Sequence, residues 1–218
     1  MRPEASAGLL YVALIHFPVY DKNRKVVRTS LTPIDLHDIA RACRTYGVRA
    51  FYVVTPLASQ RELAQTICDH WTEGYGARYN PNRKEALALV RITADLEETF
   101  RSIQFDSGFL PVTVATGARI TDWDLDCPGL RRLLRQPEGK PVLMLFGTGW
   151  GLLAETIQSA DYRLAPIQGT GRYNHLSVRS AVSIFLDRIQ GTRPQDPPDP
   201  PDKPLSRRSG PFTPESIR

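Results

Sequence analysis

The sequence predicts an α/β protein in which a mostly parallel sheet is flanked by helices. The main observation is the order of the segments, because short apolar runs typical of strands alternate with amphipathic runs typical of helices. A second observation is that the first run, Leu9–Phe17, is apolar on both faces, as strands inside a parallel sheet are. With 218 residues, of which 41% are hydrophobic, the chain is long enough to bury such a core.

The first half of the chain contains two strands and two helices with clear end signals. Thr32 and Pro33 predict the start of a helix, as an N-cap and a first-turn proline, and Gly47 predicts its end. Thr55-Pro56 ends the second strand. In chain order we expect a strand over Leu9–Phe17, a helix from Thr32 to Gly47, a strand over Ala50–Val54, a helix over Leu57–Trp71 and a Gly/Tyr-rich loop over Glu73–Pro81.

The second half continues the alternation and ends in a helix. Ligands of parallel sheets bind beyond the carboxyl ends of the strands, so the site is expected in the loops that follow them. The expected strands are Leu87–Ile92, Pro111–Ala115, Val142–Phe146 and the short Tyr162–Leu164. The expected helices are Ala94–Ile103, Gly129–Leu134, Leu152–Ser159 and His175–Ile189.

Two glycine-rich turns and a helix start follow one another near the end of this region. A buried strand runs into a glycine-rich exit at Pro141–Gly151 (PVLMLFGTGWG), a second turn covers Ala165–Gly171 (APIQGTG), and Asn174–Leu176 opens the last helix. Glycines after a strand let a ligand approach bare backbone, which predicts a pocket for a nucleotide-like ligand. The glycine spacing departs from the dinucleotide fingerprint, and no glycine loop ends in GKS or GKT, so neither NAD nor a P-loop is indicated.

Composition narrows the class of function further. No HExxH or CxxC motif occurs and the four histidines form no spaced ligand set, so we expect no bound metal. The three cysteines are widely spaced and are expected to be structural thiols. The formal net charge is +5, and Lys22, Arg24, Lys25 and Arg28 crowd one stretch. That stretch is either a solvated loop or a contact for phosphate groups.

We expect one folded domain over residues 1–191 and a disordered proline-rich tail over residues 192–218. The last 27 residues contain eight prolines, a composition that sustains neither helix nor sheet. The five basic and four acidic side chains of the tail nearly cancel, so it is not a polybasic arm. The apolar run Leu9–Ile15 is too short to span a bilayer, and a cytoplasmic protein is expected.

The helix that begins at Pro33 carries the first of three motifs. An asparagine and an arginine six residues apart, followed by an aromatic residue and glycine, define this motif. In Thr32–Arg41 (TPIDLHDIAR) and the following Tyr46-Gly47, Arg41 takes the arginine position and Asp35 replaces the asparagine.

The other two motifs lie in the glycine-rich turns. Leu145–Leu152 (LFGTGWGL) matches an apolar strand that runs into phenylalanine-glycine and then glycine-leucine. Pro166–Gly169 with Tyr173–Val178 matches a proline-hydrophobic-x-glycine turn before a serine-leucine-asparagine helix start, with His175 at the serine position and Ser177 at the asparagine position. In this order, the three motifs resemble those of the SPOUT class of S-adenosylmethionine-dependent RNA methyltransferases.

The resemblance covers about Leu9 to Ile189 and is greatest to a bacterial branch described as tRNA guanine-N1 methyltransferase-like. Four stretches carry it: HFPVYDKN, DIARACRTYGV, YNPNRKEAL and GTGRYNHLSVRSA. It implies a deep C-terminal trefoil knot, S-adenosyl-L-methionine as cofactor and a tRNA or ribosomal RNA substrate. It also implies a homodimer in which the knot of one subunit completes the site of the other.

The resemblance further implies which residues form the site. Arg41 is the first catalytic candidate, in an electrostatic role because an arginine keeps its charge at neutral pH. His37 and His175 are candidates for handling a proton, although both could instead satisfy local backbone groups. The expected cofactor-binding residues are Leu145, Phe146, Gly147, Gly149, Ile167, Gly169 and Leu176. The alternative function is a noncatalytic RNA-binding or assembly protein on the same scaffold.

Overall fold

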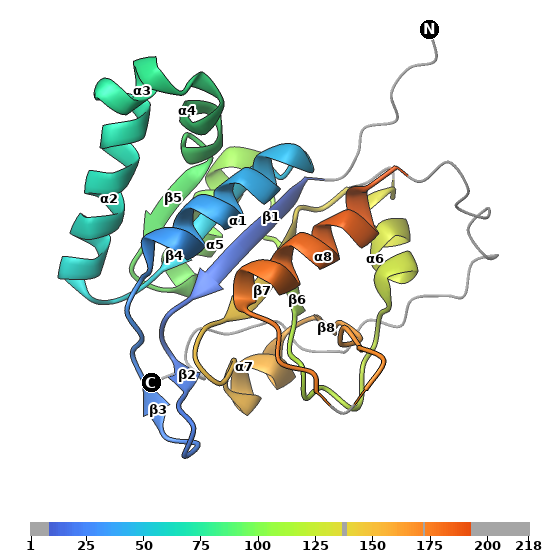
Figure 1. The fold of residues 1–218 in the computed structure, drawn as a ribbon. Coiled ribbons are helices and arrows are strands. Elements are labelled where there is room, and N and C mark those ends of the chain that lie inside the picture. The colour runs from blue at the N-terminus through green and yellow to red at the C-terminus, as the bar shows by residue number, and fades with distance from the viewer. Residues whose placement is uncertain (1–8, 137–138, 172, 193–218) are drawn as a thin grey trace, which may run out of the picture.

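The computed structural model describes residues 9–136, 139–171 and 173–192, and it contains a six-stranded sheet with helices on both faces (Figure 1). The strands lie in the order β5-β4-β1-β7-β6-β8, and each registered pair is parallel. In chain order they are β1 (Leu10–Ile15), β4 (Ala50–Val54), β5 (Val90–Thr93), β6 (Val112–Ala115), β7 (Val142–Gly147) and β8 (Tyr162–Arg163). The predicted fold class is therefore confirmed.

The centre of the sheet explains the longest apolar runs of the sequence. Every residue of β1 and of β4 is buried, because helices cover both faces of these strands. β1 lies between β4 and β7 in a parallel register that pairs Ile15 with Val54 and with Gly147. The carboxyl ends of the three strands therefore meet at one edge of the sheet.

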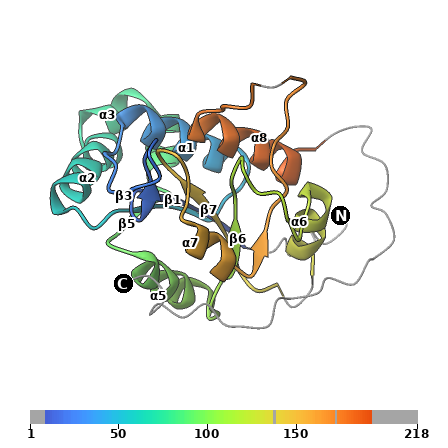
Figure 2. The same ribbon diagram turned by 90° about the horizontal axis from the view of Figure 1, so that it is seen from below.

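The helices form a layer on each face of the sheet (Figure 2). Two separate clusters of buried side chains lie between the helices and the sheet. One face carries α1 (Pro33–Thr45), α2 (Ala58–Thr72), α4 (Pro81–Leu87), α6 (Cys127–Leu134) and α8 (Val178–Gln190). The other carries α5 (Leu96–Ser107) and α7 (Ala154–Ser159).

The end signals of α1 are confirmed. The Thr32 side chain accepts a hydrogen bond from the backbone N–H of Asp35 at 3.2 Å, Pro33 is the first helical residue, and Gly47 has φ of +68°. The buried face of the helix is made by Leu36, Ile39, Ala40 and Cys43. Burial raises the pKa of the Cys43 thiol, as expected of a structural cysteine.

Three segments differ from the expectation. The loop over Glu73–Pro81 contains α3 (Tyr75–Tyr79), and α4 follows because the Asn80 side chain accepts from the N–H of Arg83 at 3.0 Å. The strand expected from Leu87 begins only at Val90, since α4 takes up Leu87. A hairpin of β2 (Val19–Tyr20) and β3 (Val26–Val27) was not expected at all.

The last helix starts later than expected because its cap lies later. The Ser177 hydroxyl accepts from the backbone N–H of Ser180 at 3.3 Å, so α8 begins at Val178 and not at His175. The expected tail lies outside the described residues from residue 193 onward. In the described part of the chain, no helix is long and apolar enough to cross a membrane. The knot concerns how the chain is threaded, and it stays a prediction.

Candidate functional site

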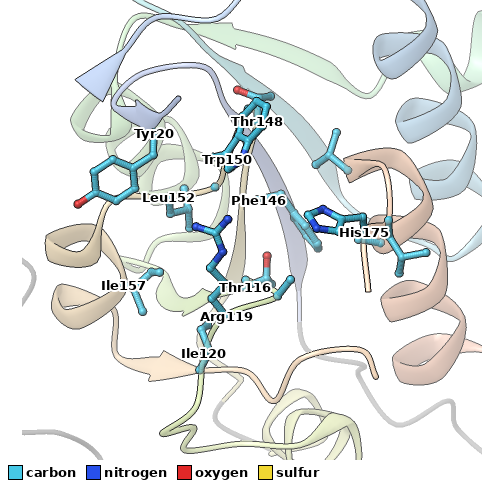
Figure 3. Close-up of a pocket in the computed structure, with 18 of the residues that line it drawn as sticks. Tyr20, Thr116, Arg119, Ile120, Phe146, Thr148, Trp150, Leu152, Ile157 and His175 are labelled. Atoms are coloured by element: carbon cyan, nitrogen blue, oxygen red, sulfur yellow. The ribbon is translucent and has the colours of Figure 1, made fainter. Parts of the chain in front are cut away.

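A cavity of about 900 Å³ opens at the carboxyl ends of β1, β6 and β7 (Figure 3). Parallel strands in register deliver their following loops to the same place, and this is where open α/β sheets bind ligands. The walls come from three stretches in particular, residues 116–122, 146–152 and 174–178, and from the β2–β3 hairpin.

The end of β7 and the loop that follows it require glycine at particular positions. A Cβ on Gly147 would lie 2.5 Å from the backbone nitrogen of Leu152, and one on Gly149 would lie 2.8 Å from the carbonyl oxygen of Tyr20. Gly149 and Gly151 also have φ of +57° and +100°, which side chains other than glycine rarely allow. At Gly151 a Cβ would meet nothing within 4 Å, so bare backbone faces open space there.

The β2–β3 hairpin is hydrogen-bonded to this glycine loop. Tyr20 donates its N–H to the carbonyl of Gly151 at 3.0 Å and accepts from the N–H of Trp150 at 2.8 Å. The loop and the hairpin therefore form one wall. Trp150 is half-exposed on this wall, and the guanidinium of Arg24 lies 4.5 Å from the ring centroid of Tyr20.

A chain of buried and half-buried polar groups lies beneath the same wall. Nδ1 of His16 is 3.0 Å from Oγ1 of Thr29, and Oγ1 of Thr29 is 2.5 Å from Oγ1 of Thr148. Thr148 in turn donates to the carbonyl of Ile15 at 3.0 Å. Burial lowers the pKa of His16 to about 4, against a smaller opposing effect of Asp35. His16 is therefore neutral at neutral pH and joins β1, the hairpin and the glycine loop.

The opposite wall is held by an arginine with two carboxylates. Arg163 on β8 contacts Asp122 at 2.7 Å and Asp124 at 2.9 Å, with only 11% of its side chain exposed. The hydrogen bond to Asp124 contributes most to raising the pKa of the guanidinium. Nearby, Asn174 donates its amide to the carbonyl of Ile167 at 2.9 Å, which ties the second turn to the start of α8.

Six of the ten predicted site residues line this cavity. They are Phe146, Gly147, Gly149, Ile167, His175 and Leu176. Leu145 is fully buried in the cluster that faces α5 and α7, and its carbonyl accepts from Thr116 at 2.8 Å. Its contribution is therefore to position the loop after β6. Gly169 lies outside the lining, although it belongs to the same turn as Ile167.

The other two catalytic candidates lie elsewhere on the subunit. Arg41 is exposed on α1 and borders a separate hollow of about 150 Å³. His37 packs edge-on against Trp71 with ring centroids 5.7 Å apart. Burial lowers the pKa of His37, and the neighbouring charge of Arg83 adds to this effect. A single subunit thus does not bring Arg41 and His37 to the cavity.

The replacement of asparagine by Asp35 has a structural explanation. Asp35 lines the cavity and forms an ion pair with Arg179 at 3.1 Å, and it accepts from the Thr32 hydroxyl at 2.7 Å. The carboxylate therefore joins the start of α1 to α8. An asparagine in the same place would remove the shorter of the two ion pairs of Arg179 and leave the one with Asp38 at 3.6 Å.

Two parts of the cavity were missed in the sequence. One is the hairpin, whose two-residue strands give no periodic pattern. The other is the loop over residues 116–122, from which the Arg119 side chain extends into the cavity between Leu152 and Thr116 (Figure 3). The expected strand over Pro111–Ala115 did indicate this loop, because it places residue 116 at the carboxyl edge of the sheet. Among the described residues, no group of three or more histidine, cysteine, aspartate or glutamate side chains could hold a metal ion.

Comparisons with known proteins agree with this geometry. Residues 9–191 match the family described as SAM-dependent RNA methyltransferase. A tRNA (guanine-N(1)-)-methyltransferase of Oleidesulfovibrio alaskensis is 43% identical over 182 residues, which are 84% of this chain and 42% of that protein. The chain therefore spans about two fifths of the length of that relative. An uncharacterised Aquifex aeolicus protein is 39% identical over 83% of this chain and 87% of its own length.

A solved structure supports the fold independently. The crystal structure of a "putative methylase family protein" from Neisseria gonorrhoeae superposes with a TM-score of 0.59 at 18% identity, covering 96% of this chain and 92% of that one.

Proposed function

The chain belongs to the family of S-adenosylmethionine-dependent RNA methyltransferases, and we propose that it transfers a methyl group from that cofactor to a nucleotide of tRNA or ribosomal RNA. The observation that carries the proposal is the glycine-walled cavity at the carboxyl edge of the sheet, within the residues that match the family. The family is one of enzymes, which favours catalysis over the noncatalytic alternative. As an enzyme acting on tRNA or ribosomal RNA, the protein is proposed to work in the cytoplasm.

The cavity fits an adenosyl group. Its volume of about 900 Å³ lies at the upper end of the usual range for ligand pockets, which leaves room beside the cofactor for part of an acceptor nucleotide. Apolar surface comes from Phe146, Ile167 and Leu176, and bare backbone comes from Gly151. When bound, S-adenosylmethionine supplies an activated methyl group on a positively charged sulfur.

The residues of the chain then have to align the acceptor and take up its proton. Methyl transfer is an in-line displacement, so holding the reacting atoms in position is the main contribution of the protein. His175 lines the cavity and is the candidate within the subunit for accepting a proton. Arg119, in the loop after β6, adds a cation to the cavity. A phosphate or the cofactor carboxylate can bind to it.

We further propose a homodimer in which Arg41 and His37 serve the cavity of the partner subunit. The exposure of Arg41 and its position outside the cavity of its own subunit support this arrangement. The proposed knot is supported by the pairing of Leu125 with Leu164, which holds the segment before α8 against the segment before α6. Size-exclusion chromatography with light scattering gives the mass of the assembly, and a monomer at micromolar concentration argues against the shared site.

The function is tested by cofactor binding and by methyl transfer. We expect calorimetry to show binding of S-adenosylmethionine, and labelled methyl groups to appear in a tRNA or ribosomal RNA fraction. The name of the 43%-identical relative makes N1 of guanine in tRNA the first acceptor to examine. No heat of binding at millimolar cofactor refutes the proposal.

A matched pair of variants on α1 tests the role of Arg41. We expect Arg41→Ala to abolish transfer while cofactor binding persists. Arg44→Ala removes the same charge one turn further along, where Arg44 forms an exposed salt bridge with Glu85 at 2.8 Å. Exposed pairs contribute little, so this control keeps transfer within about twofold of the wild type. Equal losses in both variants contradict a specific role for Arg41.

A further inference from the structure

A second, smaller hollow lies between α1 and α4, away from the cavity described above. It measures about 150 Å³ and is lined by Arg41, Asn80, Asn82 and Arg83. All four side chains carry N–H donors, and none carries a negative charge. Asn80 already uses its amide oxygen to cap α4, which leaves its NH₂ group as a donor. Such a lining suits an anion with several acceptor oxygens.

The hollow carries the positive charge of two arginines. Within the described residues, no ion pair joins Arg41 or Arg83 to a carboxylate. Arg83 instead lies over the ring of Trp71, 4.3 Å from its centroid. Arg83 and, more weakly, Arg41 lower the pKa of His37 in addition to the larger effect of its burial, against an opposing effect of Asp38. Residues 74–84 contain three cationic side chains and no carboxylate.

Two exposed tyrosines precede the hollow on α3. Tyr75 and Tyr79 are stacked with their planes at 19° and their centroids 6.2 Å apart, and 77% and 74% of their surfaces are exposed. Tyr79 directly precedes Asn80 in the lining. Large aromatic rings kept in solvent beside cations are the combination with which proteins bind single-stranded nucleic acid, because every base has a face to stack.

We propose that α3, α4 and the adjoining face of α1 bind a single-stranded stretch of the RNA substrate, with a backbone phosphate in the hollow and a base stacked on the tyrosines. The inference rests on the proposed function, since that function supplies the RNA. An acidic peptide or a free phosphate would match the arginines but would leave the stacked rings without a role. α3 and α4 lie at the opposite end of the molecule from the β2–β3 hairpin (Figure 1), so within one chain this surface is separate from the hairpin wall of the cavity. Arg41 at its border is the residue proposed to serve the cavity of the partner subunit.

The experiment measures the binding of a short fluorescein-labelled single-stranded oligoribonucleotide of mixed sequence to the full chain by anisotropy. The two test variants are Tyr75→Ala with Tyr79→Ala, and Arg83→Gln. Each has a matched control on α5, on the other face of the sheet. Phe105→Ala removes a ring that is 95% exposed, and Arg101→Gln removes a cation whose side chain is 68% exposed. Thermal unfolding and cofactor calorimetry are recorded for every variant.

We expect the tyrosine pair of substitutions to weaken RNA binding about tenfold or more. Arg83→Gln should lower the slope of log affinity against log salt by about 0.7, the value for one phosphate of a single strand. Both controls should match the wild type. Unchanged RNA affinity in folded test variants overturns the proposal. So does a result in which only Arg83→Gln acts and inorganic phosphate competes with RNA, because the hollow is then a free-phosphate site.

A third outcome also overturns the proposal. Poly-glutamate serves as the acidic peptide in a competition experiment. If it displaces RNA from the wild type, and binds the tyrosine variant with the same affinity as the wild type, charge alone is recognised. Failure of this inference leaves cofactor binding intact in all variants. Failure of the proposed function instead appears as a wild-type protein that does not bind S-adenosylmethionine, whatever happens to the RNA.

Discussion

Acidification is expected to destabilise the protein through His16. The side chain is only 1% exposed, and its pKa is lowered from 6.5 to about 4, chiefly by burial. As pH falls below 6.5, the unfolded chain takes up a proton on this histidine while the folded chain does not. Proton binding thus favours the unfolded state, and stability present above pH 6.5 is lost progressively as pH approaches 4.

The size of the effect follows from the pKa difference. One pKa unit corresponds to about 1.4 kcal/mol, so the fall from 6.5 to about 4 gives about 3.5 kcal/mol for His16 alone, of which about 3 kcal/mol is lost by pH 4. His37 also contributes in this range, because its pKa is lowered from 6.5 as well. The contribution of His16 is therefore read as a difference between wild type and a variant in which this position cannot titrate.

His16→Asn provides that variant, since asparagine keeps a polar atom near Thr29 and carries no charge. Urea unfolding followed by tryptophan fluorescence gives the free energy of unfolding at a series of pH values. We expect the wild type to lose about 3 kcal/mol more than the variant between neutral pH and pH about 4. Any constant cost of the substitution shifts the whole curve and leaves this difference untouched. Parallel curves refute the assignment of a buried neutral histidine.

Three further outcomes are expected. Gly147→Ala should reduce cofactor affinity at least about tenfold, because the new Cβ would lie 2.5 Å from a backbone nitrogen. Gly171→Ala is the control, since a Cβ there meets nothing within 4 Å, and it should bind the cofactor normally. Calorimetry compares the two variants. Asp124→Asn should lower the free energy of unfolding by about 3 kcal/mol, because Arg163 keeps only one of its carboxylates; an unshifted urea midpoint contradicts this. Reversing the three cations of Lys22–Lys25 should weaken RNA binding and flatten its salt dependence; an unchanged slope removes the hairpin from the RNA surface.

The sequence was most informative where one local pattern determines the structure. β1, β4 and β7 are continuous apolar runs, and a strand covered on both faces needs little else to be recognised. The start of α1 depends on Thr32 and Pro33, which act within one helical turn. Pattern reasoning was wrong at α3, where the glycines and tyrosines of residues 73–81 suggested a loop although Tyr75–Tyr79 forms a helix.

The candidate site could be predicted only in part, because its members are brought together by the sheet. Motif matching found the glycine loop and the turn near Ile167, and both line the cavity. The same method identified Arg41, but no motif states on which side of a helix, or in which subunit, an arginine acts. Arg41 lies outside the cavity of its own chain, so its proposed role depends on the proposed homodimer, which the pattern of one chain does not describe.

The β2–β3 hairpin shows most clearly what sequence patterns omit. Its place depends on a close approach of two backbones, in which the carbonyl of Tyr20 occupies the space that a Cβ on Gly149 would need. The glycine is thus required by a partner 129 positions away in the sequence as well as by its own φ of +57°. The cations of the hairpin are therefore held beside the cavity by the same backbone hydrogen bonds that join the hairpin to the glycine loop. Glycine spacing alone indicated the loop, and only the fold shows that loop and hairpin act as one wall.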